Sequence, residues 1–240
     1  GISVDQRIAT YLKPHQVEGV KFMWANTFGP VLPDATATSD GVPPRGCLLA
    51  HHMGLGKSLQ VVTICHSAVM HPKLREANKK MRIIVVAPKN VVDNWENEFR
   101  RWIPETCQIR LLNFDKVFPY FRNQALREWE STGGVLIIAE SIFRKLASPK
   151  IDAIGDPMAE GMRRILTQAP DFVVCDEAHM FMKRATNQGF LTLDKFKTRL
   201  RVALSGTPVQ NNLMEYHNML EWLRQGAFGT SDQFDSDFVA

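Results

Sequence analysis

The sequence predicts an α/β fold in which a parallel sheet carries helices on both faces. Short apolar runs rich in β-branched residues alternate along the chain with segments whose apolar residues recur at helical spacing. Polar motifs directly follow several of these runs, and parallel sheets bind their ligands at the carboxyl ends of the strands. A glycine-rich turn also joins one apolar run to a helical segment, which is the context of a phosphate-binding loop.

The first predicted helix begins near Pro14, because proline is well placed in the first turn of a helix. Its buried face would be formed by apolar residues at helical spacing, namely Val17, Val20, Met23 and Trp24. Residues 29–45 are rich in Pro, Ser, Thr, Asp and Gly, which predicts a mobile loop inserted before the next strand.

The remaining elements follow from the same alternation of patterns. After the strand at 47–50 and a helix from Leu59 to Val69, buried strands are predicted at 83–87, 109–112, 135–139, 172–175 and 201–204. Helices are predicted between and after them at 90–102, 116–130, 151–168 and 212–223.

The glycine-rich turn reads GCLLAHHMGLGKS and ends at Ser58. Gly54 and Gly56 would let backbone N–H groups crowd around a polyphosphate, to which the helix N-terminus adds partial positive charge. Lys57 would reach the β and γ phosphates, and Ser58 would offer its hydroxyl to magnesium. His51 stands where the full motif has glycine, so a glycine-rich strand-to-helix turn without a nucleotide is the alternative for this stretch alone.

A second motif strengthens the nucleotide interpretation. Asp176 ends an apolar run, where its carboxylate could hold a magnesium that bridges the β and γ phosphates. Glu177 follows directly and could act as the general base toward the attacking water. An Asp-Glu pair at a strand end is common by chance, but behind a phosphate loop in an α/β chain it indicates nucleotide hydrolysis.

Composition narrows the class of protein. The 240 residues suit one large domain or two small ones, and the apolar share of 45% is ample for a packed core. A net charge of +4 permits a polyanionic partner without requiring one. The four cysteines lack the paired spacing of a zinc cluster, and two lie in strand-like runs, which indicates reduced core thiols in a cytosolic or nuclear protein. No apolar run approaches a membrane span, so we expect no membrane partner.

Five motifs in this order give the chain a resemblance to the SWI/SNF-type ATPases of helicase superfamily two: LKPHQ, HHMGLGKS, VVAPKNVVDNWENEF, DEAH and LSGTPVQNNLMEY. The resemblance covers nearly the whole chain. The commoner family loop has Asp-Glu or Asp-Gly before Met-Gly-Leu-Gly-Lys, whereas this chain has His51-His52. That pair, together with PDFVVCDEAH and LKPHQVEGVKFMW, looks most like the ATRX-like branch.

The resemblance implies the first RecA-like lobe of a P-loop NTPase, a DNA-dependent ATPase that translocates on duplex DNA and remodels chromatin. Residues 1–240 would form one helicase ATP-binding domain, with an adenine-side helix at 1–28 and a loop insertion at 29–45. It implies ATP and Mg²⁺ as cofactors, nucleosomes as partners and a nuclear location. The second helicase lobe, which supplies arginine fingers in the family, is absent from this sequence, so the isolated lobe is expected to be nearly inactive.

The resemblance also implies roles for individual residues. Gln16 matches an adenine-reading glutamine, although a surface glutamine is the alternative that the residue pattern favours. Asp176 and Glu177 match the magnesium and water pair, with Lys57 as the third catalytic residue. The nucleotide-binding loop would comprise His52, Met53, Gly54, Leu55, Gly56, Lys57 and Ser58.

Two further groups match elements that act beyond the nucleotide. His179 and the turn formed by Ser205, Gly206 and Thr207 look like the relay between nucleotide state and DNA grip. The family's first lobe touches the phosphates of the tracking DNA strand at positions that correspond to Lys89, Asn90 and Ser141. Solvated polar loop ends are the alternative for these last three residues.

Two other functions compete with a duplex-DNA translocase. The letters DEAH also label RNA and DNA helicases, but the QNN after SGTP and the helix around Trp95 speak against that class. A nucleotide-gated docking scaffold on chromatin is the second alternative. The intact set of Lys57, Asp176 and Glu177 argues against an inert scaffold, which would have no need of it.

Overall fold

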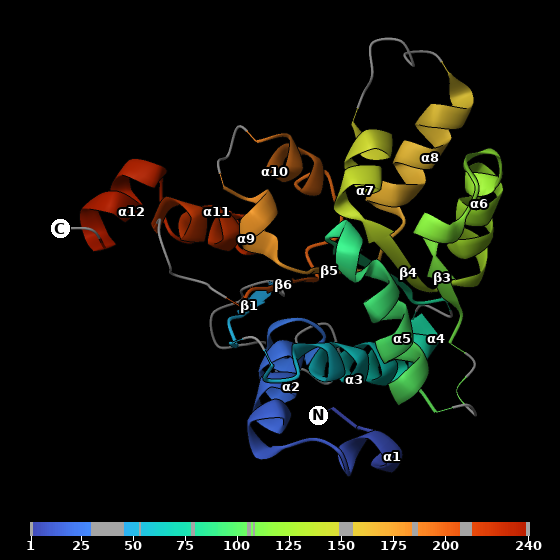
Figure 1. Ribbon diagram of the computed structural model, residues 1–240. Helices are drawn as coiled ribbons and strands as arrows, with labels where there is room; N and C mark the ends of the chain where they lie inside the picture. The colour runs from blue at the N-terminus through green and yellow to red at the C-terminus, as the bar shows by residue number, and fades with distance from the viewer. Residues whose placement is uncertain are drawn as a thin grey trace.

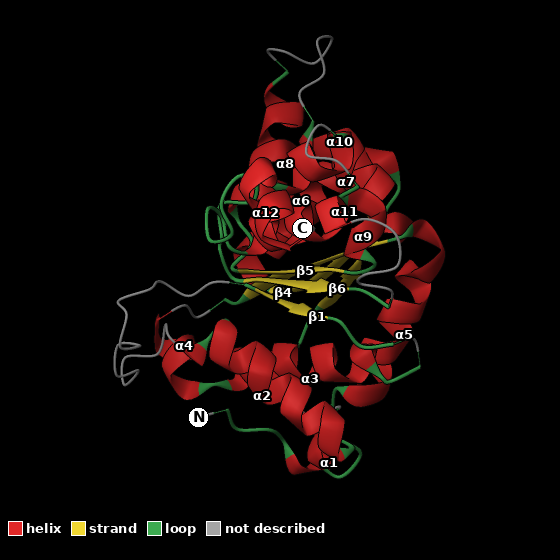
Figure 2. Ribbon diagram, turned by 90° about the vertical axis from the view of Figure 1, so that its left-hand side faces the viewer, coloured by secondary structure: helices red, strands yellow, loops and turns green. Residues whose placement is uncertain are grey.

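A six-stranded parallel sheet lies between two layers of helices (Figures 1 and 2). This computed structural model describes residues 2–29, 46–52, 54–77, 80–104, 107, 109–148, 156–183, 187–206 and 213–238. The strands are β1 (Cys47–Leu49), β2 (Arg82–Ala87), β3 (Leu111–Asn113), β4 (Gly134–Ala139), β5 (Phe172–Cys175) and β6 (Arg201–Leu204). They lie in the order β1-β6-β5-β2-β4-β3, so the predicted α/β fold with a parallel sheet is confirmed.

One layer of helices packs on the face of the sheet toward the N-terminus (Figure 2). It contains α1 (Gln6–Ala9), α2 (Pro14–Asn26), α3 (Lys57–Met70), α4 (Pro72–Ala77) and α5 (Val92–Trp102). Apolar residues of α2, α3 and α5 join one side of the strands in a single buried cluster. The predicted face of α2 is confirmed in part, because Val20, Met23 and Trp24 are buried whereas Val17 is half-buried.

The opposite layer covers the other face. It contains α6 (Arg122–Thr132), α7 (Glu140–Ala147), α8 (Pro157–Gln168), α9 (Ala178–Phe181), α10 (Gln188–Leu193), α11 (Leu213–Leu223) and α12 (Ser231–Phe238). Trp129, Phe143 and Trp222 are among the large side chains that fill a second buried cluster on this face. Because both faces are covered, the central strands are buried throughout, which explains their continuous apolar runs.

The structure corrects several predicted boundaries. The strand expected at 109–112 lies at Leu111–Asn113, and the helix expected at 116–130 begins only at Arg122. Two short 3₁₀ segments, Phe114–Lys116 and Pro119–Phe121, precede that helix, because Pro119 cannot donate a backbone hydrogen bond within a helix. The short helices α1, α4, α7, α9, α10 and α12 were not predicted, since four to eight residues carry little periodicity. Of the insertion predicted at 29–45, residues 30–45 lie outside the described residues.

Two simpler features concern the apolar length of the helices and the state of the cysteines. None of the described helices combines the length and the apolar character needed to cross a bilayer. All four cysteines are buried free thiols, and burial raises the pKa of Cys47 to about 12. These thiols are therefore core residues with little thiolate character.

Arg201, the first residue of β6, is a fully buried cation. It connects this strand to α11 and to the segment between α10 and β6. Its guanidinium donates hydrogen bonds to the carbonyl oxygens of Thr198 (2.9 Å), Trp222 (2.9 Å) and Phe196 (2.5 Å). Burial is the main reason that its pKa falls to about 10, so it stays protonated at neutral pH. The arginine thus compensates its own desolvation with acceptors from two segments, the connection before β6 and the end of α11.

Replacement of Arg201 by methionine is expected to lower the free energy of unfolding by about 2–4 kcal/mol, because buried carbonyl groups lose their donor. Urea unfolding of the variant measures this change. Arg164→Met is the matched control, since Arg164 pairs with Glu130 at an exposed position and should cost less than about 1 kcal/mol. Equal losses in the two variants would contradict a structural role for Arg201.

Candidate functional site

The predicted motifs follow three strands that are neighbours in the sheet. β6 lies between β1 and β5, so the loops after these three strands meet at one edge (Figure 1). The backbone N–H of Ser205, just after β6, donates to the carbonyl of Leu49 at the end of β1 (3.3 Å). The glycine loop, the Ser205 turn and the Asp176-Glu177 pair therefore share one corner of the molecule.

The glycine loop has the backbone geometry that its sequence predicts. Gly54 and Gly56 have positive φ angles of 82° and 71°, a region that side chains with a Cβ rarely adopt. Gly56 is also approached closely by the side-chain nitrogen of Gln16. Directly after Gly56, α3 begins at Lys57, so the helix N-terminus and its free N–H groups face the loop.

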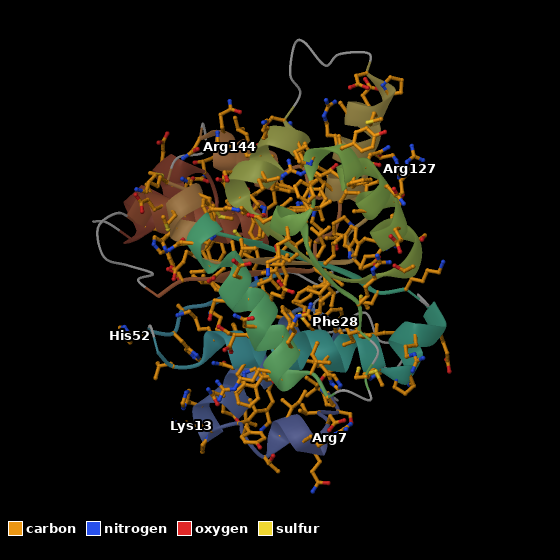
Figure 3. All side chains as sticks on the ribbon, turned by 45° about the vertical axis from the view of Figure 1, so that its right-hand side comes forward. Arg7, Lys13, Phe28, His52, Arg127 and Arg144 are labelled. Carbon is orange, nitrogen blue, oxygen red and sulfur yellow. The ribbon has the colours of Figure 1, made fainter. Side chains whose placement is uncertain are left out.

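The Lys57 ammonium lies over this loop rather than in the core. It donates to the carbonyl oxygens of His51 (2.8 Å) and His52 (3.4 Å). These hydrogen bonds hold a cation beside the glycine loop at the N-terminus of α3. The side chain of His52 is exposed and points away from the ribbon at the outer edge of the loop (Figure 3). Met53 lies outside the described residues.

Gln16 is buried, with 6% of its surface exposed, so the alternative of a surface glutamine is wrong. Its oxygen accepts a hydrogen bond from the N–H of Lys13 (2.9 Å), and its nitrogen donates to the carbonyl of Leu55 (3.2 Å). A ring nitrogen of His15 lies 3.2 Å from the same carbonyl. The start of α2 therefore braces the phosphate loop.

His51, the departure from the full motif, packs between α2 and α3. Its Nδ1 lies 3.3 Å from the Gln60 side-chain nitrogen, and its ring centroid lies 6.2 Å from that of His15. Burial lowers the pKa of His51, and the positive charges of His15 and Lys57 lower it further. A neutral His51 can accept a hydrogen bond from Gln60, so this residue connects the loop to α3.

Asp176 is held at the end of β5 by two hydrogen bonds. Its carboxylate accepts from the indole N–H of Trp95 (2.8 Å) and from the backbone N–H of Glu177 (2.9 Å). Burial raises the pKa of Asp176, whereas the Trp95 hydrogen bond and the charge of Lys57 lower it. Lys57 follows β1 and Asp176 follows β5, and these two strands lie on either side of β6.

Trp95 is a site residue that sequence reasoning assigned only to a helix face. Helical spacing places Trp95 on the buried face of a helix, but no local pattern predicts its hydrogen bond to Asp176, which lies 81 positions later.

Glu177 adopts a strained backbone and begins a chain of polar contacts. Its φ of 47° is the only positive value among the described non-glycine residues, and such strain clusters at functional sites. The Nδ1 atom of His179 lies 3.4 Å from the Glu177 carboxylate and 3.0 Å from the Ser205 hydroxyl. His179 therefore connects the loop after β5 to the turn after β6. Gly206 is buried beside Ser205, and Thr207 lies outside the described residues.

The residues expected to contact DNA phosphates follow two other neighbouring strands. Lys89 and Asn90 follow β2, and Ser141 follows β4, whose last residue pairs with the last residue of β2. All three are exposed. The Lys89 ammonium makes an ion pair with Asp115 (2.6 Å), a residue that no motif contains. The structure thus brings the three residues to one edge of the sheet.

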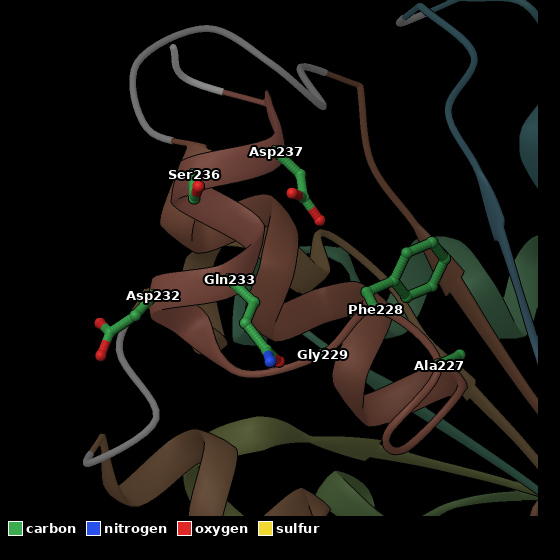
Figure 4. A pocket seen from close by; sticks show the side chains of 7 residues that line it. All are labelled: Ala227, Phe228, Gly229, Asp232, Gln233, Ser236 and Asp237. Atoms are coloured by element: carbon green, nitrogen blue, oxygen red, sulfur yellow. The ribbon is translucent and has the colours of Figure 1, made fainter.

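A pocket at α12 is a separate feature. It is lined by residues 227–229 of the preceding turn and by Asp232, Gln233, Ser236 and Asp237 (Figure 4). None of these residues belongs to the predicted nucleotide site. Two carboxylates on the pocket would repel a polyphosphate, so we assign no nucleotide to it.

Comparison with known sequences identifies relatives over the whole chain. The SNF2-related domain family matches residues 15–240. The Transcriptional regulator ATRX homolog of Drosophila melanogaster is 35% identical over 246 residues, which cover 99% of this chain and 18% of that protein. Protein CHROMATIN REMODELING 20 of Arabidopsis thaliana is 35% identical over 239 residues, which cover 99% of this chain and 15% of that protein. The chain thus spans less than a fifth of these curated relatives.

Comparison with solved structures supports the fold. The Sulfolobus solfataricus SWI2/SNF2 ATPase core in complex with dsDNA has a TM-score of 0.65 and 22% identity, over 95% of this chain and 38% of that chain. This likeness confirms the RecA-like architecture, and the ATRX relatives confirm the branch that the motifs resemble. With a family match over nearly its whole length, the chain belongs to the SNF2-related domain family.

Proposed function

We propose that this chain is the ATP-binding lobe of a DNA-dependent ATPase that translocates on duplex DNA and remodels chromatin. The observation that carries the proposal is the placement of two loops, one with Lys57 after β1 and one with Asp176 and Glu177 after β5, on either side of β6. A glycine loop, a helix N-terminus and a buried carboxylate together form a site for a nucleotide triphosphate.

The donor groups in this corner fit ATP with magnesium. Backbone N–H groups from Gly54 to Ser58 and the Lys57 ammonium would bind the phosphates, while Gln16 would read the adenine edge. Hard oxygen donors suit Mg²⁺, and the Ser58 hydroxyl and the Asp176 carboxylate supply them. Magnesium would neutralise charge that develops on the phosphates. The remaining loop residues, His52, Met53 and Leu55, would shape the wall of the site.

Glu177 would accept a proton from the attacking water, since it directly follows Asp176 after β5 and its side chain is partly open to solvent. His179 contacts both the Glu177 carboxylate and the Ser205 hydroxyl. Proton transfer from the attacking water to Glu177 would therefore alter the contacts of the turn formed by Ser205, Gly206 and Thr207. These residues are our candidates for the coupling between nucleotide state and DNA grip.

Lys89, Asn90 and Ser141 would contact the phosphates of the tracking strand. All three are polar and exposed at adjacent strand ends, which suits contacts that are independent of sequence. Two relatives carry the names Transcriptional regulator ATRX and Protein CHROMATIN REMODELING 20, which favours nucleosomes as partners and a nuclear location. We further propose that residues 1–240 act as one lobe, with 1–28 on the adenine side and 29–45 as an insertion, and that a second helicase lobe completes the ATP site.

The test is ATP hydrolysis by the protein in its natural full-length form, measured with duplex DNA, single-stranded DNA and RNA. We expect duplex DNA to give the strongest stimulation. Preferential stimulation by RNA would favour an RNA helicase of the DEAH type. If the protein binds ATP but hydrolyses none with duplex DNA, single-stranded DNA or RNA, a docking scaffold would be favoured.

Residues 1–240 alone are expected to hydrolyse ATP barely above background, with or without DNA. Phosphoryl transfer depends on positioning and on cations around the γ phosphate, and in the family a second lobe supplies part of that set. A phosphate-release assay of the purified fragment beside the full-length protein measures the difference. Robust DNA-stimulated turnover by the fragment would contradict the proposed need for a second lobe.

Binding of duplex DNA should be salt-dependent and indifferent to sequence, with a slope of about −2 to −4 in log K against log salt for this lobe. Lys89→Ala is expected to reduce the slope by roughly one unit and to weaken all duplexes alike. Fluorescence anisotropy of two unrelated duplexes across a salt series measures both effects. Arg164→Ala is the control. Arg164 lies in α8 near the start of β5, whereas Lys89 follows the end of β2, so the two residues lie toward opposite ends of the parallel strands. A preference for one duplex, or an unchanged slope in Lys89→Ala, would count against this contact.

A further inference from the structure

Asp115 is a nearly buried carboxylate at the edge of the sheet where Lys89 and Ser141 lie. Its side chain is 5% exposed, although it belongs to a short connecting segment directly after β3. The Asn113 side chain accepts a hydrogen bond from the Asp115 N–H (3.2 Å), which fixes the turn that carries the carboxylate. A buried carboxylate is costly unless it is paired, so its partners define what it does.

The two oxygens of Asp115 reach two different strand ends. Oδ1 accepts from the backbone N–H of Ala139, the last residue of β4 (2.9 Å). Oδ2 accepts from the Lys89 ammonium, which follows β2 (2.6 Å). Since the strand order is β2-β4-β3, this carboxylate reaches across β4 to the loop beyond it. One side chain therefore joins the loop of Lys89 to the segment that leads into Ser141.

The ion pair is asymmetric in its exposure. The Lys89 side chain is 66% exposed, whereas its partner is almost completely covered by protein. A charge-assisted hydrogen bond of this kind restricts the ammonium to one position while leaving it open to solvent on the other side. A DNA phosphate that approaches Lys89 must share the ammonium with Asp115 and is repelled by the negative charge behind it.

A second carboxylate near β3, Glu96 in α5, also pairs with exposed cations. Glu96 accepts hydrogen bonds from Asn113 (2.8 Å) and Lys116 (2.8 Å). Burial alone would raise the pKa of Glu96, but the hydrogen bonds from Lys116, Asn113 and Arg100 lower it to about 2. Glu96 is therefore ionised at neutral pH and balances the charge of Lys116. The cations beside β3 are thus held by carboxylates.

We propose that Asp115 is a positioning residue that holds Lys89 in place for DNA phosphate and at the same time limits how tightly Lys89 can bind it. The inference rests on the proposed DNA contact of Lys89. A motor must release each phosphate as it advances, and a counter-charge behind the contacting lysine weakens the contact without removing it. The hydrogen bond from Ala139 also ties this contact to the end of β4.

The test is a double-mutant cycle in the full-length protein with Asp115→Asn, Lys89→Ala and the double variant. Asparagine can still accept from Ala139 but no longer carries a charge. We expect Asp115→Asn to tighten duplex binding about three- to tenfold at low salt and to steepen the salt slope by up to about one unit. In the Lys89→Ala background the same change should alter affinity less than about twofold.

A second readout separates this role from a merely structural one. ATP turnover at saturating duplex DNA is expected to fall about two- to fivefold in Asp115→Asn, because tighter phosphate contacts release more slowly. Damage to the fold would instead weaken DNA binding and turnover together. Glu128→Gln is the matched control, since it removes one negative charge from the exposed pair with Arg110, which precedes the start of β3.

The outcomes of the cycle are distinguishable. If Lys89→Ala weakens binding but Asp115→Asn does not change it, the inference about Asp115 is wrong and the DNA contact stands. If Asp115→Asn acts equally with and without Lys89, its effect does not pass through Lys89 and the inference is overturned. If Lys89→Ala changes nothing, the proposed DNA contact itself is wrong.

Discussion

Replacement of Lys57 by alanine is expected to abolish ATP turnover in the full-length protein, with a loss of at least about a hundred- to a thousandfold. The Lys57 ammonium is the cation of the proposed phosphate loop, where it donates a hydrogen bond to the carbonyl of His51. Lys57 is the only lysine or arginine in the sequence from His51 to Ser58, so its loss removes the fixed positive charge proposed to lie beside the β and γ phosphates. Nucleotide affinity should fall together with turnover.

The fold should survive this change. The Lys57 ammonium donates to two loop carbonyls and to no core residue, so we expect the free energy of unfolding to change by no more than about 1.5 kcal/mol. Urea unfolding and binding of a fluorescent ATP analogue measure the two properties separately. Lys21→Ala, which removes a charge from the exposed face of α2, should leave both unchanged. Turnover near the normal rate in Lys57→Ala would refute the assignment of the phosphate loop.

Glu177→Gln should give a different pattern, in which nucleotide binding is kept and hydrolysis is lost. Glutamine has nearly the same shape and can keep the contact with His179, but it cannot accept a proton from water. General base catalysis contributes about a hundred- to ten-thousandfold, so single-turnover hydrolysis should slow by at least about a hundredfold. ATP affinity should stay within about threefold of the unaltered protein.

The measurement is a rapid-mixing experiment that records binding and chemistry in the same reaction. Glu18→Gln removes one negative charge from an exposed position on α2 and serves as the control. If Glu177→Gln kept a normal hydrolysis rate, another group would have to take the proton. If it lost ATP binding as well, Glu177 would have a structural role in the site.

The sequence by itself determined which segments form strands and where the phosphate loop lies. After their first residues, strands β2 and β4 are continuous apolar runs, as is the whole of β5, because they are buried on both faces. The loop is also a local feature, since the positive φ angles of Gly54 and Gly56 depend on the residue type at those two positions. Helix boundaries were less predictable, because proline and short length weaken the periodic signal near Pro119.

Only the tertiary structure decided which of these loops meet. The strand order β1-β6-β5-β2-β4-β3 brings Lys57 and Asp176 into one corner, although more than a hundred residues separate them in the chain. Gln16 illustrates the same dependence. A polar residue in a first helical turn is usually exposed, but the packing of α2 against the phosphate loop buries it and occupies both ends of its amide.

The contacts of Trp95 and Asp115 have the same origin. Trp95 donates a hydrogen bond to a carboxylate 81 positions away. Asp115 accepts hydrogen bonds from Lys89 and Ala139, at separations of 26 and 24 residues. No periodicity or motif encodes such pairs, because each depends on the order and register of several strands at once. The sequence therefore predicted the residues that we propose to bind and hydrolyse a nucleotide, while the side chains that hold those residues in place emerged only when the strands were packed side by side.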